Sequence, residues 1–237
     1  MDISLKPTRF DSVLDAALCA RWLAAIDGTI ARFRETPHHP DFSRYSSSLR
    51  LHALSSNGCD TPMLIGQQVR HGALRATLAG CLGTHLMLMV DQCWARQQYA
   101  PHRYPPDHTP HGWHQDGALH LDFAAPQPRL LNMVTCWIAL TPAGDVSPGL
   151  ELIPGRLPYP LQPDELTADA VAARFGSADP WRPVMKAGDA LLFDGNTLHR
   201  TFVEPAMRAD RTSIELRFVA AGAQPARLRA ETLVVIE

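Results

Sequence analysis

The sequence predicts a mainly β fold with flanking α-helices, arranged as a β-sandwich or jelly roll. Up to about residue 83, apolar side chains recur at helical spacing, which is typical of amphipathic helices packed on a core. Beyond that point, short segments rich in β-branched and aromatic residues alternate with turns that contain proline and glycine. Long helices do not alternate with these segments, so a parallel α/β sheet is disfavoured.

Three helical segments are expected. Residues 12–35 read as an amphipathic helix, and Ser12 with Asp15 resembles the capping box that begins such a helix. Residues 61–83 open with Thr61-Pro62, an N-cap followed by proline at the first helical position. Residues 163–175 form the one helical insertion among the strands.

The strands are expected almost entirely in the second part of the chain. They cover residues 85–99, 130–140, 149–153, 190–193, 198–203, 212–220 and 232–236, with one earlier short strand near 49–51. A length of 237 residues suits one compact domain. The expected single domain therefore spans residues 1–237, with helical support over about 1–83 and a β core over about 84–237.

Composition narrows the class of protein. A hydrophobic fraction of 46%, a charged fraction of 19% and a net charge of −2 predict a globular chain with a sizeable core. Acidic and basic residues are mixed without a basic stripe, so no nucleic-acid partner is expected. The most apolar run, residues 86–90, is too short to span a bilayer, so no membrane association is expected either.

The cysteines indicate a compartment. Their number is odd, with five in all and no CxxC pair, which favours free thiols in a reducing, cytoplasmic setting. The N-terminus also lacks the pattern of a signal peptide. Only Lys6 and Lys186 among the 22 basic residues are lysine, a coding bias that hints at a GC-rich bacterial genome. The oligomeric state is left open by the sequence.

A His-x-Asp triplet gives the strongest chemical signal. On an extended strand, residues i and i+2 point to the same face, so His114 and Asp116 can offer a nitrogen and an oxygen to one ion. His199 is the best third ligand, because it follows an apolar strand and a tight turn, where a neighbouring antiparallel strand returns. Two histidines and one carboxylate leave the opposite face of a metal open, as in non-haem iron(II) enzymes that use O₂.

Other interpretations of these residues stay open. A His-x-Asp triplet occurs often by chance, and a single histidine such as His199 is ambiguous on its own. Five histidines between His102 and His120 could form a zinc site, although structural zinc usually recruits cysteine and none lies nearby. Gln115 should point away from a metal held by its two neighbours, so it is not assigned as a ligand.

Four segments in a fixed order carry a family resemblance. They are Trp113–Asp116; Cys136–Leu140 with Gly149–Gly155; Lys186–Phe193 followed by His199-Arg200-Thr201; and Arg211–Phe218. In these segments the sequence resembles the phytanoyl-CoA dioxygenase-like family of iron(II)/2-oxoglutarate-dependent oxygenases, over about residues 85–220. One departure is Arg156-Leu157, which replaces a small residue and a histidine after Pro-Gly and puts contacts on the substrate side in doubt.

The resemblance implies a double-stranded β-helix core, also described as a cupin-like jelly roll, with Fe(II) at one open end. It also implies 2-oxoglutarate and O₂ as co-substrates, with Arg211 binding the distal carboxylate of 2-oxoglutarate through a bidentate fork. Arg208 is the fallback for that role and Arg217 a weaker one. Thr201 is expected to support the same carboxylate and Trp137 to line the pocket, although each is otherwise an ordinary strand or core residue.

The function implied is a dioxygenase that hydroxylates an unactivated C–H bond of a small molecule, such as an amino acid or natural-product intermediate, with release of succinate and CO₂. Asp116 favours hydroxylation over halogenation, because related halogenases carry a small residue in its place. Desaturation, cyclisation or epimerisation on the same scaffold remain alternatives. Two others are a non-catalytic jelly roll that binds a metal or ligand and a cupin-type enzyme that does not use 2-oxoglutarate.

Overall fold

A computed structural model describes residues 5–36, 38–57, 72–118, 129–155, 157, 159–223 and 233–236. The expected helix start at Thr61-Pro62, the histidine at position 120 and the departure at Arg156 lie outside these residues. No helix in these ranges combines the length and the hydropathy needed to cross a bilayer.

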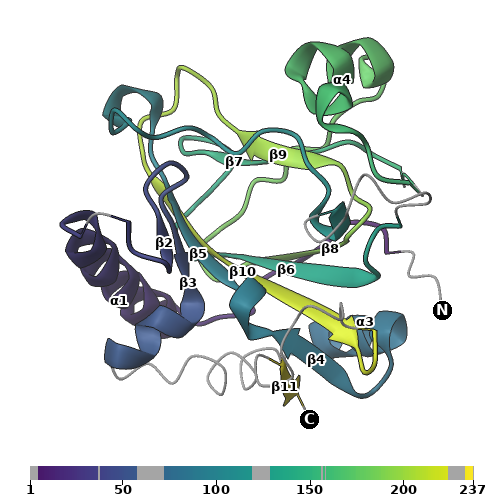
Figure 1. The fold of residues 1–237 in the computed structure, drawn as a ribbon, viewed down its shortest axis with the longest axis horizontal. Coiled ribbons are helices and arrows are strands. Elements are labelled where there is room, and N and C mark those ends of the chain that lie inside the picture. The colour runs from purple at the N-terminus through teal and green to yellow at the C-terminus, as the bar shows by residue number, and fades with distance from the viewer. Residues whose placement is uncertain are drawn as a thin grey trace.

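The described strands form two antiparallel sheets. In the large sheet the strand order is β1-β8-β6-β10-β5-β3-β2, and β4 pairs with both β10 and β11. The small sheet pairs β7 with β9, and Figure 1 shows it above the middle of the large sheet. The strands are β1 (Thr8–Phe10), β2 (Phe42–Ser43), β3 (Ser48–Arg50), β4 (Leu86–Met89), β5 (Trp94–Gln98), β6 (Met133–Ala139), β7 (Gly149–Leu152), β8 (Ala190–Asp194), β9 (His199–Phe202), β10 (Arg211–Ala220) and β11 (Leu233–Ile236).

Helices pack on the outer face of the large sheet. The long helix α1 (Ala16–Arg34) and the shorter α3 (Gly72–Leu82) bury apolar side chains in a core that includes Trp22, Ile26 and Leu78. The helix α4 (Ala168–Phe175) lies apart from them, at the upper edge of the molecule in Figure 1. Five 3₁₀ helices complete the described elements: η1 (Leu51–Asn57), η2 (Val90–Gln92), η3 (Pro101–Arg103), η4 (Asp116–Ala118) and η5 (Pro163–Leu166).

Side chains along β10 alternate between the apolar core under the helices and the space between the two sheets. Its even-numbered residues Ile214, Leu216 and Phe218 join the core under the helices. Its odd-numbered residues 211, 213, 215 and 217 are polar or charged, and all four are buried. Because successive side chains on a strand point to opposite faces, the polar set is directed into the space between the two sheets. Strand β6 repeats the pattern, with Cys136 in the helical core and Trp137 between the sheets.

The mainly β fold predicted from the sequence is confirmed, with corrections to several elements. The predicted strand over 85–99 is two strands, β4 and β5, separated by η2. The predicted helix over 163–175 is η5 followed by α4. The short strands β1 and β2 were not predicted, and with β3 they make the N-terminal part of the chain a contributor to the large sheet.

The start of the first helix also differs from the prediction. The helix begins at residue 16, after Asp15, whose carboxylate accepts from the backbone N–H of Leu18 over 2.7 Å. Ser12 adopts a positive φ of 53° and its N–H donates instead to Asp189. A single aspartate cap therefore replaces the predicted capping box, because Ser12 belongs to the turn that joins β1 to the helix.

Candidate metal centre

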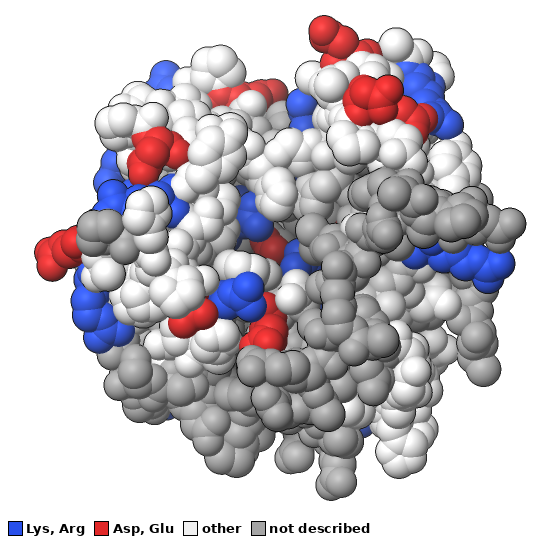
Figure 2. Space-filling view, in the orientation of Figure 1, with Lys and Arg blue, Asp and Glu red and all other residues white. Residues whose placement is uncertain are grey.

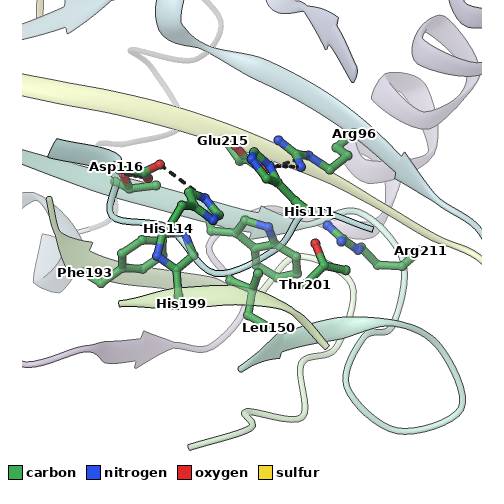
Figure 3. Close-up of a pocket in the computed structure, with 12 residues that line it drawn as sticks. Arg96, His111, His114, Asp116, Leu150, Phe193, His199, Thr201, Arg211 and Glu215 are labelled. Carbon is green, nitrogen blue, oxygen red and sulfur yellow. Dashed lines mark hydrogen bonds and ion pairs between the residues drawn. The ribbon is translucent and has the colours of Figure 1, made fainter. Parts of the chain in front are cut away.

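The structure brings His114, Asp116 and His199 together. One ligand atom from each lies within 4.8 Å of the other two, and Nε2 of His114 is 3.7 Å from Oδ1 of Asp116. The two histidine backbones exchange hydrogen bonds of 2.9 and 3.0 Å, which pin the loop that carries His114 against the start of β9. Figure 3 shows the three side chains converging from the loop and from β9.

The local backbone differs from the strand that the sequence predicted. His114 forms only an isolated β-bridge, and Asp116 is the first residue of η4. Strand alternation is therefore not what aligns the two side chains. The chain turns tightly after Asp116 because Gly117 packs on Gly195: its N–H donates to the carbonyl of Gly195 over 2.8 Å, and an added Cβ would lie 2.9 Å from that oxygen.

Both histidines have a fixed orientation. Nδ1 of His114 lies 2.7 Å from the carbonyl oxygen of Gly112, and Nδ1 of His199 lies 3.0 Å from that of Thr197. A carbonyl only accepts, so each Nδ1 carries the proton and each Nε2 keeps a free lone pair. Burial, followed by the neighbouring histidines His199 and His111, holds the pKa of His114 well below its ordinary value. The neutral, ligating form is thus favoured.

Asp116 is buried and held through both oxygens. Thr135 Oγ1 donates to Oδ2 over 2.6 Å, and Arg217 Nη2 donates to Oδ1 over 2.8 Å. Burial alone would raise the pKa of this carboxyl, but the charge of Arg217 and the nearby histidines and hydroxyl outweigh it and lower the pKa well below its ordinary range. The triad therefore offers an ionised carboxylate at all physiological pH values.

A small cavity lies beside the triad, between the two sheets. It is lined by all three triad residues together with Arg96, His111, Thr135, Trp137, Leu150, Phe193, Thr201, Arg211 and Glu215. In Figure 3 the phenyl ring of Phe193 and the carboxylate of Asp116 lie at one end and Arg211 at the other. Three of the residues predicted to bind a co-substrate, Arg211, Thr201 and Trp137, thus share one cavity with the triad.

Among these three residues, Arg211 has the most hydrogen-bond donors without an acceptor. It is 1% exposed, its Nη1 donates to Ser213 Oγ over 2.6 Å, and its Nε and Nη2 have no hydrogen-bond partner. The indole Nε1 of Trp137 is also buried without a partner, and the guanidinium carbon of Arg211 lies 5.2 Å from the centre of the Trp137 ring. Burial, with the nearby charge of Arg96, lowers the pKa of Arg211 to about 9. Buried donors without acceptors are costly, so this end of the cavity suits an anion.

The other two candidate arginines lie elsewhere. Arg208 is exposed and donates to the carbonyl oxygens of Pro205 and Met207, and it does not line the cavity. Arg217 is engaged with Asp116 and approaches Glu215 to 3.6 Å.

The sequence reasoning assigned no role at this site to Thr135, Arg96 or Glu215. Strand alternation along β10 could have indicated Glu215, since it lies between the apolar residues Ile214 and Leu216.

Gln115 does not line the cavity, in agreement with the expectation that it points away from the metal. Its Oε1 accepts from the N–H of Leu161 over 2.8 Å, and its Nε2 donates to the carbonyl of Asn196 over 3.1 Å. It therefore ties the loop that carries His114 to two other segments instead of facing a metal.

Comparison with known proteins places this geometry in a family. The model of the family described as phytanoyl-CoA dioxygenase (PhyH) matches residues 8–203. The chain belongs to the phytanoyl-CoA dioxygenase family. This confirms the family found by resemblance and extends the match to the N-terminal strand and helix, whereas the segment Arg211–Phe218 lies beyond the matched residues. No curated protein matches the sequence of this PhyH-family chain.

Solved structures share its fold. The epimerase SnoN, in complex with Fe³⁺, alpha-ketoglutarate and nogalamycin RO, is 20% identical with a TM-score of 0.69, over 98% of this chain and 94% of SnoN. The carbocyclase SnoK from nogalamycin biosynthesis is 14% identical with a TM-score of 0.65, over 98% of this chain and 92% of SnoK. EctD from S. alaskensis with bound Fe is 17% identical with a TM-score of 0.66, over 92% and 74%. These likenesses confirm the predicted jelly-roll fold class.

Proposed function

We propose that this PhyH-family chain is an iron(II)- and 2-oxoglutarate-dependent dioxygenase that oxidises a small molecule. One observation carries the proposal: a buried arginine with two unused donors, Arg211, shares a cavity with a His-Asp-His triad. A metal site alone would not need a buried cation at the far end of the same cavity. A keto acid that binds a metal at one end and carries a carboxylate at the other needs both.

The triad fits ferrous iron. Two imidazole Nε2 atoms and one carboxylate oxygen are a ligand set typical of non-haem iron, and such a set occupies one face of the metal and leaves the opposite face for further ligands. The described cysteines are free and none belongs to the triad, which disfavours a structural zinc site. When bound together, iron and 2-oxoglutarate would activate O₂. The activated oxygen would oxidise 2-oxoglutarate to succinate and CO₂ and would also oxidise the substrate.

The residues at the far end would bind and orient the co-substrate. The guanidinium of Arg211 is a planar fork that matches a carboxylate, and Ser213 fixes it through Nη1. Its Nε and Nη2 are the atoms left to donate, and the buried Nε1–H of Trp137 offers a third donor nearby. Thr201, on the same face of β9 as His199, adds a hydroxyl to the lining. Leu150 and Phe193 add apolar surface to a lining that is otherwise largely polar.

The expected outcome for the substrate is hydroxylation, since Asp116 keeps the position that a halide occupies in related halogenases. Similarly folded proteins include an epimerase in complex with Fe³⁺ and alpha-ketoglutarate and an alpha-ketoglutarate-dependent carbocyclase, so epimerisation and cyclisation are the alternatives to hydroxylation. Mass spectrometry of the product decides between them. Hydroxylation adds one oxygen atom, desaturation or oxidative cyclisation removes two hydrogen atoms, and epimerisation leaves the mass unchanged.

An anaerobic titration tests the proposal directly. Addition of Fe(II) and then 2-oxoglutarate to the protein should produce the weak visible charge-transfer band of a keto acid chelated to iron. His114→Ala should abolish the band, and Arg211→Met should require much more 2-oxoglutarate to form it. Arg208→Met is the matched control, since Arg208 is exposed outside the cavity.

The same titration separates the alternatives. A protein that binds iron but shows no band with 2-oxoglutarate would be a cupin-type enzyme or a binding protein, and the co-substrate assignment would be wrong. A band that survives His114→Ala would show that the ligand assignment is wrong. Succinate formation in air then distinguishes an enzyme from a non-catalytic binding protein.

A further inference from the structure

Arg96 is a second buried arginine in the cavity. It lies on β5, is 6% exposed, and lines the same cavity as the triad. Its Nη1 bonds to Nδ1 of His111. Its Nε forms an ion pair with Oε1 of Glu215 over 3.3 Å, but the geometry is not that of a hydrogen bond, so the N–H keeps no acceptor. A buried guanidinium keeps an unused donor at a cost unless a ligand supplies the acceptor. The feature therefore points to a group that is bound there.

The contact with Arg96 fixes the tautomer of His111. A guanidinium only donates, so Nδ1 of His111 must accept and the ring proton must sit on Nε2. The ring stacks on that of His114, with centroids 4.1 Å apart and planes 8° apart, and the backbone carbonyl of His111 accepts from the N–H of Thr201. Figure 3 shows the His111 ring between Arg96 and His114. Its one donor, Nε2–H, is thus available beside a metal ligand.

The charges around this pair favour an anion. The cavity lining and the partner of Asp116 contribute three arginines, Arg96, Arg211 and Arg217, but only two carboxylates, Asp116 and Glu215. Arg217 pairs with Asp116 at 2.8 Å, so it partly neutralises the charge that would otherwise face the metal alone. A divalent cation adds two positive charges to this buried cluster. Anionic groups near the metal are therefore stabilised electrostatically.

We propose that Arg96 and His111 form a second carboxylate-recognition point beside the triad, separate from Arg211. The inference rests on the proposed function. The carboxylate has one of two sources: the end of 2-oxoglutarate that binds the metal, or an acidic group of the substrate. In either case Nε of Arg96 and Nε2–H of His111 donate to it. Arg96 has two tasks, since it binds the anion and holds His111 in the donating tautomer.

Two variants test the pair. The charge-neutral double variant Arg96→Met/Glu215→Gln removes the guanidinium without leaving a buried carboxylate unpaired. His111→Phe keeps an aromatic ring against His114 and removes both nitrogens. Arg50→Met is the control, because Arg50 lies outside the cavity and donates to the carbonyl of Asp91. If the double variant does not fold, as judged by circular dichroism, His111→Phe decides alone.

The first readout is binding of 2-oxoglutarate to the protein loaded with Zn(II), followed by thermal shift. If 2-oxoglutarate is the source of the carboxylate, both variants need about 10- to 100-fold more of it than wild type, whereas the control does not. Thermal shift needs no visible band, so this result is independent of the iron chromophore. A missing band in wild type would then count against the proposed function and not against this pair.

The second readout uses a matched pair of probes, benzoate and benzamide, added to the protein with Zn(II) and saturating 2-oxoglutarate. If the substrate is the source, the variants bind 2-oxoglutarate like wild type. Wild type then binds benzoate at least about tenfold more tightly than benzamide, and both variants lose this preference. The proposal is overturned if 2-oxoglutarate binding is unchanged in the variants and wild type does not distinguish the two probes.

Discussion

Thr135→Val isolates the support that the triad carboxylate receives from a residue that is not itself a metal ligand. Thr135 Oγ1 donates to Asp116 over 2.6 Å, and both side chains are about 1% exposed, so water cannot replace the bond. Valine keeps the shape of threonine and leaves one carboxylate oxygen without its donor. A hydrogen bond to a charged group contributes roughly 1.5–3 kcal/mol. Since 1.4 kcal/mol is a factor of ten, metal affinity should fall about 10- to 100-fold.

Competition between the apo protein and a chelating indicator for Co(II) or Zn(II) measures this change. Urea unfolding of the metal-free protein should show a loss of about 1–3 kcal/mol, because the buried carboxylate loses a donor in the fold itself. Thr77→Val is the control: Thr77 donates to the carbonyl of Ala73 on α3, away from the site. Wild-type metal affinity and stability in Thr135→Val would refute the reasoning and show that Arg217 alone positions Asp116.

Three further predictions concern the loop, the fold and pH. Gly117→Ala should lower metal affinity strongly in a Co(II) titration, because its Cβ would lie 2.9 Å from two carbonyl oxygens; Gly112→Ala, with nothing within 4 Å, should not. Glu151→Gln should cost about 1–2 kcal/mol in urea unfolding and leave metal affinity intact, since this buried carboxylate pairs with two half-exposed arginines. Burial and nearby arginines lower the pKa of His108 to about 4, so the unfolded chain binds the proton more readily and stability declines as pH falls from about 6.5 toward 4. His108→Gln should reduce that slope by about 1.4 kcal/mol per pH unit, and an unchanged slope would contradict it.

The triad was predicted on the assumption that His114 and Asp116 lie on a strand, and the structure does not support that assumption. The spacing of His114 and Asp116 suggested a strand, but a 3₁₀ turn and a close contact between two glycines direct the side chains instead. The convergence was predicted because the two residues are close in sequence and His199 follows a recognisable strand. The contact between Gly117 and Gly195 joins positions far apart in the chain, so no local pattern reveals it.

The residues that line the cavity were also hard to predict, because their positions depend on contacts between distant parts of the chain. Arg211 was favoured over Arg208 and Arg217 by the family resemblance, and its burial and unpaired donors distinguish it from Arg208 in the structure. Burial of an arginine depends on which strands flank it, and pairing of β10 with both β5 and β6 is a long-range property. The ion pair of Asp116 with Arg217 could not be foreseen for this reason, and Arg217 was considered only as a weaker candidate for the carboxylate of 2-oxoglutarate.

The secondary-structure prediction was likewise better for long elements than for short ones. The helix over residues 16–34 has a long, regular apolar stripe, so its existence was clear and only its first turn was wrong. The short strands β1 and β2 have two or three residues each, and they lie at opposite edges of a sheet formed mostly by later residues. A segment of that length has no periodicity of its own to detect.

The alternation along β10 limits how this chain can vary. Nine consecutive buried positions from 211 to 219 serve two different surroundings, aliphatic packing on one side and ionic recognition on the other. Deleting or inserting a single residue before the strand would exchange the two sets and drive guanidinium groups beneath the helices. A change of two residues would keep each side chain on its own face of the sheet but would shift its pairing with the neighbouring strands. Homologues of this chain should therefore show length changes in the turns at either end and almost none within the strand itself.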